Sequence, residues 1–317
     1  MTAIMCCCPL LLLSGCNQVE KNFPSKPVRL IVPYAPGGAA DQTARALAAS
    51  SQKTLGQSIT VINKGAEQGP AGGFAFGADA AADGYTVTLI TADLVTLPMM
   101  GQKQAGYQQF EPLISLNVDP VVVAVRIDSP WKNVQDFITY AKANPGSLRV
   151  GNAGAGTLWH LAALALEKKS GVRFSHQPFP GAAPALTALV NRELEAVAVS
   201  QAEATNLAAA GKIRILGVMS SHPPALLPNV QTMRQQGYDL TLATWRGLAV
   251  PKGTPAPIMK KLIEAFQSGT QETPFLQYMA KAGIEMRLLS RETFYQEIKQ
   301  QDDFFRSVLS EAGIAPR

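Results

Sequence analysis

The sequence predicts an α/β protein built from two lobes. Its 317 residues exceed one ordinary domain. Short runs rich in β-branched residues alternate with helical stretches of about 10–15 residues, a pattern typical of βαβ units and of a mainly parallel sheet covered by helices. The same pattern restarts near residue 120. Hydrophobic residues make up 47% and charged residues 16% of the chain, so it can bury a core and is not disordered.

The first block of the pattern contains three strands. Val28–Tyr34 is a β-branched run, and the Pro-Gly-Gly after it leads into an Ala-rich helical stretch. A Gly-rich loop at 65–73 precedes a further helix, and Asp83-Gly84 is a turn signal before the third strand. We expect, in order, strand 28–34, helix 40–55, strand 59–62, a helix after residue 73 and strand 85–91.

The second block repeats this alternation, and a third block closes the chain. In the last helix Phe294, Ile298, Phe305 and Leu309 follow helical spacing, which predicts an apolar stripe packed against a lobe. We expect strands 120–125, 148–150, 196–199, 213–219 and 245–250, and helices 134–143, 157–170, 185–191, 257–267 and 291–311.

The order of the blocks implies that the chain leaves one lobe and later returns to it. We expect lobe 1 to comprise 23–118 and 244–317, and lobe 2 to comprise 119–243. In open α/β sheets the strand carboxyl ends and helix N-termini converge at one edge, where ligands bind. The sequence therefore predicts a ligand cleft between the lobes.

The N-terminal segment predicts export. Cys6, Cys7, Cys8 and Cys16 are the only cysteines, so thiol catalysis and internal disulfides are excluded from the folded body. The apolar stretch at 3–15 is too short to span a bilayer and is typical of a signal peptide.

The end of this stretch, Leu13-Ser14-Gly15-Cys16, resembles the lipobox of bacterial lipoproteins. We expect 1–16 to be a lipoprotein signal peptide, 17–27 to be a linker, and acylated Cys16 to hold the protein on a membrane in the periplasm. Residues 1–15 contain no Lys or Arg, so an ordinary secretory signal cleaved nearby, or a disordered start, is the alternative.

The charge pattern favours a small anionic solute over nucleic acid. The net charge is +5, but Lys and Arg are scattered singly or in pairs such as Lys168-Lys169, with no stripe of base-stacking aromatic residues. A mildly positive field suits a small anion.

Three loops of small residues each lead from a strand into a helix start, at 34–41, 150–157 and 179–185. Unpaired N–H groups at a helix N-terminus suit a carboxylate or phosphate. No Gly-Lys-Ser/Thr follows the first loop, so it is not a P-loop. Each loop by itself could be a plain turn, with Asp41 and Thr157 serving only the first helical turn, but three together favour an anion clamp.

Six motifs taken in order make the chain recognisable. They resemble the tripartite tricarboxylate transporter substrate-binding family, also called the Bug family, over residues 23–314. The motifs are Lys26-Pro27-Val28-Arg29-Leu30-Ile31-Val32-Pro33, Pro36-Gly37-Gly38-x-x-Asp41, Asp83-Gly84-Tyr85-Thr86, Gly181-x-x-Pro184-Ala185-Leu186, Ala210-Gly211-Lys212-Ile213-Arg214 and Pro251-Lys252-Gly253-Thr254-Pro255.

The resemblance implies a type II periplasmic binding-protein fold, two α/β lobes closing around a central ligand cleft. It implies a small organic-acid ligand held by backbone amides and ordered water, without a cofactor or metal. By position it nominates Ala35, Gly37, Gly38 and Asp41, with Thr91 and Asp93, in lobe 1, and Asn152, Gly156, Thr157, Gly181, Ala182 and Ser200 in lobe 2.

The chain departs from many relatives at two places. It has Phe179-Pro180 where they have Tyr-Lys, and Val199 where they have Asp. Asp93 is acidic in a site expected to hold anions, so it faces solvent or contacts a ligand amine. These departures leave the ligand's identity open.

Catalysis is the first rival interpretation. The histidines are His160, His176 and His222, and no sequence feature pairs His160 with a nucleophile or a carboxylate. No metal or acyl-transfer motif is present. We therefore expect a non-enzymatic monomer that delivers its ligand to integral membrane permease subunits. The alternative is a sensor component that presents the ligand to a two-component signalling kinase.

Overall fold

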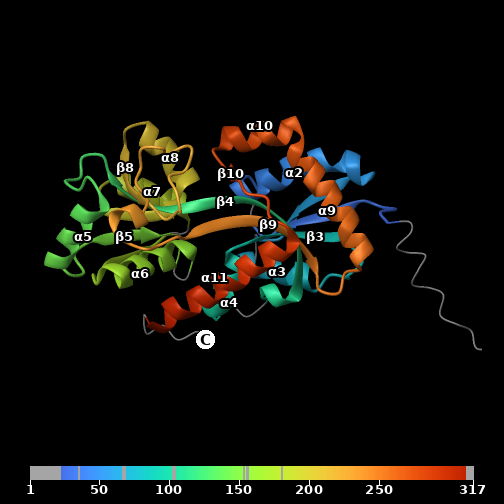
Figure 1. Ribbon diagram of the computed structural model, residues 1–317, viewed down its shortest axis with the longest axis horizontal. Coiled ribbons are helices and arrows are strands. Elements are labelled where there is room, and N and C mark those ends of the chain that lie inside the picture. Colours follow the sequence, from blue (N-terminus) through green and yellow to red (C-terminus); the bar gives the residue numbers. More distant parts are fainter. Residues whose placement is uncertain are drawn as a thin grey trace, which may run out of the picture.

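The computed structural model describes residues 23–311 except 35, 66–68, 102–104, 153, 155–156 and 180. The predicted signal peptide, most of the linker, Cys16, Ala35 and Gly156 therefore lie outside the described residues. The described part is an α/β protein of two lobes, as predicted, and Figure 1 shows them side by side.

One lobe is formed by the two ends of the described chain. Its sheet has the order β2-β1-β3-β9-β4, and β10 pairs with β4. Its elements are β1 (Val28–Val32), α2 (Ala39–Leu55), β2 (Ile59–Asn63), α3 (Gly69–Ala78), β3 (Thr86–Thr91), α4 (Asp93–Met99), β9 (Ala243–Pro251), α9 (Ala256–Gln271), α10 (Thr273–Ala282), β10 (Glu285–Met286) and α11 (Arg291–Glu311).

The other lobe is formed by the middle of the chain. Its strands continue from β4 in the order β4-β7-β5-β6, and β8 also pairs with β4. Its elements are the second half of β4 (Phe110–Arg126), α5 (Val134–Ala143), β5 (Arg149–Asn152), α6 (Leu158–Ser170), β6 (Ser175–Pro178), α7 (Ala182–Val190), β7 (Ala196–Ser200), α8 (Gln201–Ala209) and β8 (Ile213–Val218).

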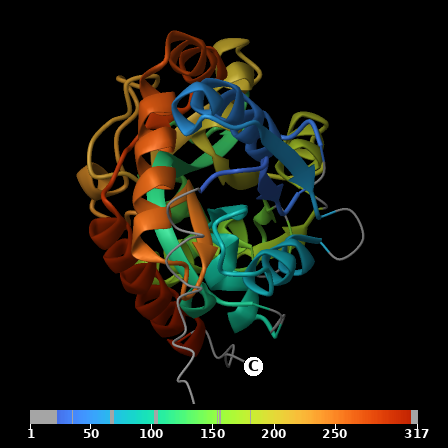
Figure 2. The ribbon, with the colours of Figure 1, turned by 90° about the vertical axis from the view of Figure 1, so that its right-hand side faces the viewer.

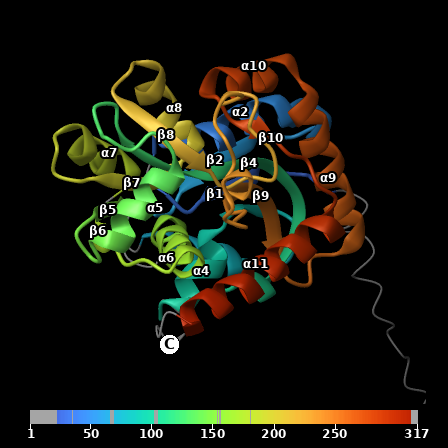
Figure 3. The ribbon, with the colours of Figure 1, turned by 60° about the vertical axis from the view of Figure 1, so that its left-hand side comes forward.

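Two long strands join the lobes. β4 pairs with β9 from Phe110 to Pro120 and with β7 from Val121 to Val125. In Figures 1 and 3 both strands run between the two groups of helices. The expectation of a mainly parallel sheet was wrong for these strands, because β4 and β9 pair antiparallel with all their partners. Among the described strands, parallel ladders join β1 to β2 and β3 in one lobe and β5 to β6 and β7 in the other.

Helices cover both faces of the first lobe's sheet. α2, α9 and α10 pack on one face, where Leu47, Leu262 and Phe275 are fully buried. α3, α4 and α11 pack on the other face, as the end-on view in Figure 2 shows. The predicted stripe of α11 is confirmed as core, since its four members, Phe294, Ile298, Phe305 and Leu309, are at most 1% exposed.

Two glycines allow close packing near the predicted site. A Cβ on Gly247 of β9 would lie 2.3 Å from the Phe294 ring, so its absence lets α11 rest directly on this strand. A Cβ on Gly73 of α3 would lie 2.5 Å from Cα of Pro33. This close contact lets α3 support the chain that follows β1. α3 starts at Gly69, inside the segment expected to be a loop.

Candidate functional site

The loop after β1 is held by Asp41. This side chain, 3% exposed, accepts hydrogen bonds from Gly37 N at 2.8 Å, Asn63 Nδ2 at 2.9 Å and Arg45 Nε at 3.0 Å. Burial raises its pKa, but the hydrogen bonds from Arg45, Gly37 and Asn63 together hold the pKa of Asp41 below its ordinary value. Asp41 therefore fixes the shape of the loop, and its negative charge is balanced by Arg45.

The start of α2 faces open space. Gly38 is the N-cap residue, and no side chain caps the helix there. The first N–H groups of a helix have no partner within the helix. A Cβ added at Gly37 or Gly38 would meet nothing within 4 Å. These two predicted residues therefore border room for a bound group next to helix amides.

Thr91 and Asp93 lie together at the end of β3, and Tyr34 joins them from the end of β1. The Tyr34 hydroxyl lies 2.6 Å from Thr91 Oγ1 and donates to Asp93 Oδ2 at 2.9 Å. The Asp93 backbone N–H donates to Thr91 Oγ1 at 3.2 Å. Burial raises the pKa of Asp93, and burial and the charge of Asp93 raise the pKa of Tyr34.

Ser200 caps α8 and does not hold a free hydroxyl. Its Oγ donates to Glu203 Oε2 at 2.9 Å and accepts from Glu203 N at 3.3 Å, a reciprocal capping arrangement. Asp119, in β4, accepts from Ala202 N at 3.1 Å at the same helix start. Burial raises the pKa of both Asp119 and Glu203.

Asn152 ends β5 and is completely buried. Its Oδ1 accepts from Gly154 N at 3.0 Å, whereas its Nδ2 has no hydrogen-bond partner among the described residues. Thr157 Oγ1 donates to Gly154 O at 2.8 Å, which closes the described part of this loop. Asn152 thus has one buried donor available for a partner.

The third loop ends at Gly181, whose φ of 140° only glycine adopts without strain. Gly181 is the N-cap residue of α7, and no side chain caps this helix. Ala182 follows as the first helical residue and is 5% exposed. α7 therefore begins at residue 182, directly after Gly181, and not at residue 185 as predicted.

The histidines form a packed pair in lobe 2. The rings of His160 and His176 are 4.9 Å apart, and His176 Nε2 lies 3.2 Å from Glu167 Oε2. Burial, and then the neighbouring His176, lower the pKa of His160 to about 4. Within the described residues no group of three or more His, Cys, Asp or Glu side chains is arranged to hold a metal ion.

The sequence analysis did not identify Arg246, whose positive charge acts on groups in both lobes. Arg246 in β9 influences the pKa of Tyr34 and Asp93 in lobe 1 and of Asp119 and Glu203 at the junction with lobe 2. One signal could have found it, because Arg246 is the only charged residue in the apolar strand 243–251. The predicted residues thus belong to two groups, one at the ends of β1 and β3 and one at the ends of β5 and β7.

None of the described helices combines the length and the apolar character needed to span a bilayer.

Comparison with known proteins agrees with the fold. The profile of the tripartite tricarboxylate transporter family receptor matches residues 43–313. A UPF0065 protein of Bordetella pertussis is 30% identical over 97% of this chain and 96% of its own length. A TctC solute-binding protein from Polaromonas, solved without ligand, has 37% identity and a TM-score of 0.81, covering 91% of this chain and 99% of that one. MatC from Rhodopseudomonas palustris, solved with bound malate, has 27% identity and a TM-score of 0.76, covering 90% of this chain and 100% of that one.

Proposed function

The chain belongs to the tripartite tricarboxylate transporter receptor family, and we propose that it captures a small carboxylate, a di- or tricarboxylate or related organic acid, by closing its two lobes. It then delivers this ligand to the membrane permease subunits of a tripartite tricarboxylate-type transporter. Members of the family are transport receptors and not enzymes. Closure is driven only by the difference between the ligand's affinity for the closed and for the open form.

One observation carries the carboxylate assignment. Gly37 and Gly38 border open space directly before the first amides of α2, and among the described residues no side chain caps that helix. We propose that a ligand carboxylate binds there, next to Ala35 and Asp41 and to Thr91 and Asp93. Binding of malate by the related MatC supports this assignment.

We propose that lobe 2 closes onto the same ligand with the loops at the ends of β5, β6 and β7. Two observations on the described residues support this arrangement, since among them the buried Nδ2 of Asn152 has no partner and no side chain caps the start of α7. The contributing residues are Asn152, Gly156, Thr157, Gly181, Ala182 and Ser200.

The lobe boundaries proposed are 23–118 with 244–317 for lobe 1, and 119–243 for lobe 2. They are supported by a change of pairing along β4, which pairs with β9 up to Pro120 and with β7 from Val121 onward. Strands that continue through a junction can bend there while both lobes stay rigid.

The cellular place proposed is the periplasm, with the protein held on a membrane by acylated Cys16. The likeness to the periplasmic binding protein BugD, 30% identical with a TM-score of 0.78, supports the compartment. The lipobox-like Leu13-Ser14-Gly15-Cys16 supports the anchor.

A thermal-shift screen tests the function. The purified protein is exposed to mono-, di- and tricarboxylates, amino acids and phosphates. At about a hundredfold excess over Kd, a true ligand stabilises by about 2.7 kcal/mol, which raises Tm by several degrees.

Gly38→Val should abolish the shift and lower the Tm of the free protein only modestly, because Gly38 has room for a side chain and an ordinary φ of −75°, although valine is a poorer N-cap residue than glycine. Ala49→Val, on an exposed position of the same helix, is the matched control. Shifts caused by phosphates or uncharged solutes, with none from carboxylates, would overturn the proposal.

A further inference from the structure

Three polar residues form a row across neighbouring strands where the lobes meet. Arg246 of β9 pairs with Thr91 of β3 on one side and with Asn117 of β4 on the other. Residues paired across antiparallel strands are immediate neighbours on the same face of a sheet. Arg246 and Asn117 therefore lie side by side on one face of the sheet, next to Thr91 of the predicted site.

This row contains hydrogen-bonding groups without partners. Asn117 is 1% exposed, and neither its Nδ2 nor its Oδ1 has a partner among the described residues. Nη1 of Arg246 is also buried and, within the same residues, has no acceptor. Unpaired buried polar groups are costly and rare in folded proteins. Their presence at one place points to a partner that binds there.

The nearby acids do not supply that partner. Asp93, Asp119 and Glu203 all lie close enough for Arg246 to influence their pKa. Each accepts hydrogen bonds elsewhere, from Tyr34, from Ala202 N and from Ser200 respectively. No ion pair within 4.0 Å joins Arg246 to an acid of the described chain. The guanidinium is thus surrounded by negative charge but not hydrogen-bonded to it.

We propose that Arg246, with the Asn117 amide beside it, binds a second acidic group of the ligand and makes the protein selective for acids with two carboxylates. This inference rests on the proposed function, in which the first carboxylate binds beside Gly38 at the start of α2. Tyr34 connects the two positions, because its hydroxyl lies 2.6 Å from Oγ1 of Thr91, which pairs with Arg246, and because it begins the loop that carries Gly37 and Gly38. A guanidinium fork also matches the planar geometry of a carboxylate.

The first experiment changes the ligand and leaves the protein intact. Straight-chain dicarboxylates of four to six carbons are each compared by calorimetry with their monoamides, which keep the shape but lose one charge. The preferred dicarboxylate should bind about 10- to 100-fold more tightly than its monoamide, as expected for a charge-assisted hydrogen bond.

The second experiment changes the protein. Arg246→Gln should weaken the preferred dicarboxylate by about 10- to 100-fold and leave its monoamide within about threefold, which erases the preference. Arg149→Gln is the matched control. Arg149 lies at the start of β5, and its half-exposed guanidinium is bonded to Glu195.

The outcomes separate this inference from the proposed function. If no carboxylate or monoamide binds the unmodified protein, the proposed function fails. If carboxylates bind but dicarboxylates and monoamides bind equally, or Arg246→Gln keeps the preference, only the role of Arg246 fails. Should Arg246→Gln not fold, the comparison of ligands on the unmodified protein still decides.

Discussion

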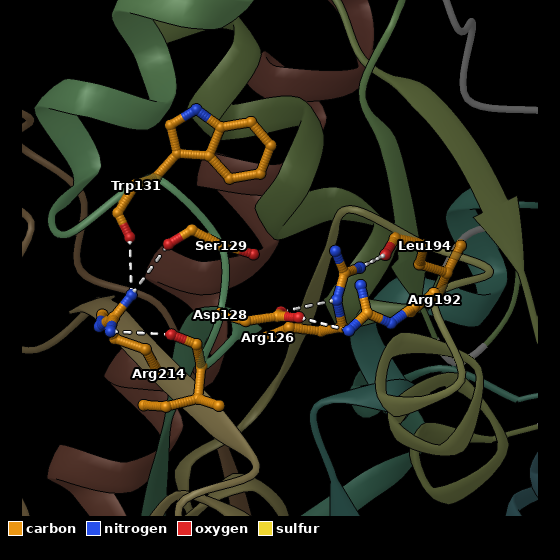
Figure 4. Close-up of polar contacts among 8 residues, drawn as sticks. Arg126, Asp128, Ser129, Trp131, Arg192, Leu194 and Arg214 are labelled. Atoms are coloured by element: carbon orange, nitrogen blue, oxygen red, sulfur yellow. Dashed lines mark hydrogen bonds and ion pairs between the residues drawn. The ribbon is translucent and has the colours of Figure 1, made fainter.

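The arginines at the far end of lobe 2 and the arginine at the lobe junction have opposite surroundings. At the far end, Arg214 donates to the carbonyl oxygens of Ile127, Ser129 and Trp131 at 2.9, 3.3 and 3.1 Å. Arg126 donates to Leu194 O and to Asp128, as Figure 4 shows. At the junction Arg246 has a buried Nη1 with no acceptor in the described structure.

This difference separates two uses of one residue type. Where each guanidinium finds acceptors in the protein, it fixes the segment that carries those acceptors, here 127–131 after β4. Where donors are buried without acceptors, the folded state retains a cost that only a bound partner can remove. Changes at the far end should therefore affect stability more than changes at the junction, and the junction should govern binding.

The largest expected effect on stability is that of Arg214→Ala. The loss of three hydrogen bonds from a charged donor should lower the free energy of unfolding by about 3 kcal/mol, and Tm by about 2–4 °C per kcal/mol. Ligand affinity should not change. Denaturant unfolding and calorimetry measure both, with Arg234→Ala, an exposed arginine bonded to Asp239, as the control. A loss below about 1 kcal/mol would show that Arg214 does not brace the segment.

Arg246→Met should have a smaller and pH-dependent effect, a loss of about 1–2 kcal/mol at pH 8. Burial raises the pKa of Asp93, Asp119 and Glu203, and Arg246 counteracts this rise. An acid whose folded pKa is raised stabilises the fold below its unfolded pKa and loses that contribution as the pH rises through the folded pKa. Without Arg246 these pKa values rise further, so the loss should shrink as the pH falls from 8 toward 5.5. The deficit of Arg214→Ala should stay constant, and equal deficits of Arg246→Met at both pH values would contradict this account.

Asn117→Leu should stabilise the free protein by about 1 kcal/mol, because it removes two buried polar atoms that have no partner in the described part of the chain. The same change should weaken dicarboxylate binding. Asn133→Leu is the matched comparison, since the Asn133 side chain caps α5 by accepting from Asp136 N and its loss should cost about 1 kcal/mol. If Asn117→Leu is the more destabilising of the two, the Asn117 amide is already bonded in the free protein.

The smallest effect is expected for Asp128→Asn at the far end. Asp128 bonds Arg126 at 3.0 Å and Arg192 at 2.6 Å. Burial raises its pKa, but these two arginines together hold the pKa of Asp128 below its ordinary value. The pairs are exposed and screened by salt. At low salt the Tm of Asp128→Asn should lie slightly below that of the unmodified protein. This difference should disappear in about 1 M NaCl. A Tm difference that persists at high salt would show that Asp128 stabilises the fold in the way proposed for Arg214.

The sequence predicted the elements that carry a clear hydrophobic pattern. The helix with Phe294, Ile298, Phe305 and Leu309 and the family fold are confirmed. α8 was not predicted, because only Gln201 and Ala204 are buried in it and it has no apolar stripe. The first half of β4 was also missed. The antiparallel pairing of β4 and β9 is set by contacts between residues far apart in the chain, which local patterns do not report.

The candidate site was predictable only in its loops. Glycines and helix starts pointed to Gly38, Asn152 and Gly181, because these requirements are local. The row of Arg246 and Asn117 was not found, since their pairing depends on the sheet and not on spacing in the sequence. In the structure the side chains of Asp41 and Ser200 form hydrogen bonds within their own segments. Residue type alone does not distinguish this structural role from ligand binding.

The position of β9 in the sheet has a consequence for how the polypeptide is made. β9 lies between β3 and β4, yet it is synthesised more than a hundred residues after both of them begin. Until residue 251 has emerged, a nascent chain has open edges on both strands, and open edges invite pairing with other chains. The middle of the chain can fold meanwhile, because its strands from β5 to β8 are already complete. A chaperone that shields the early part of the polypeptide should therefore matter more for this protein than for one whose central strand is made first.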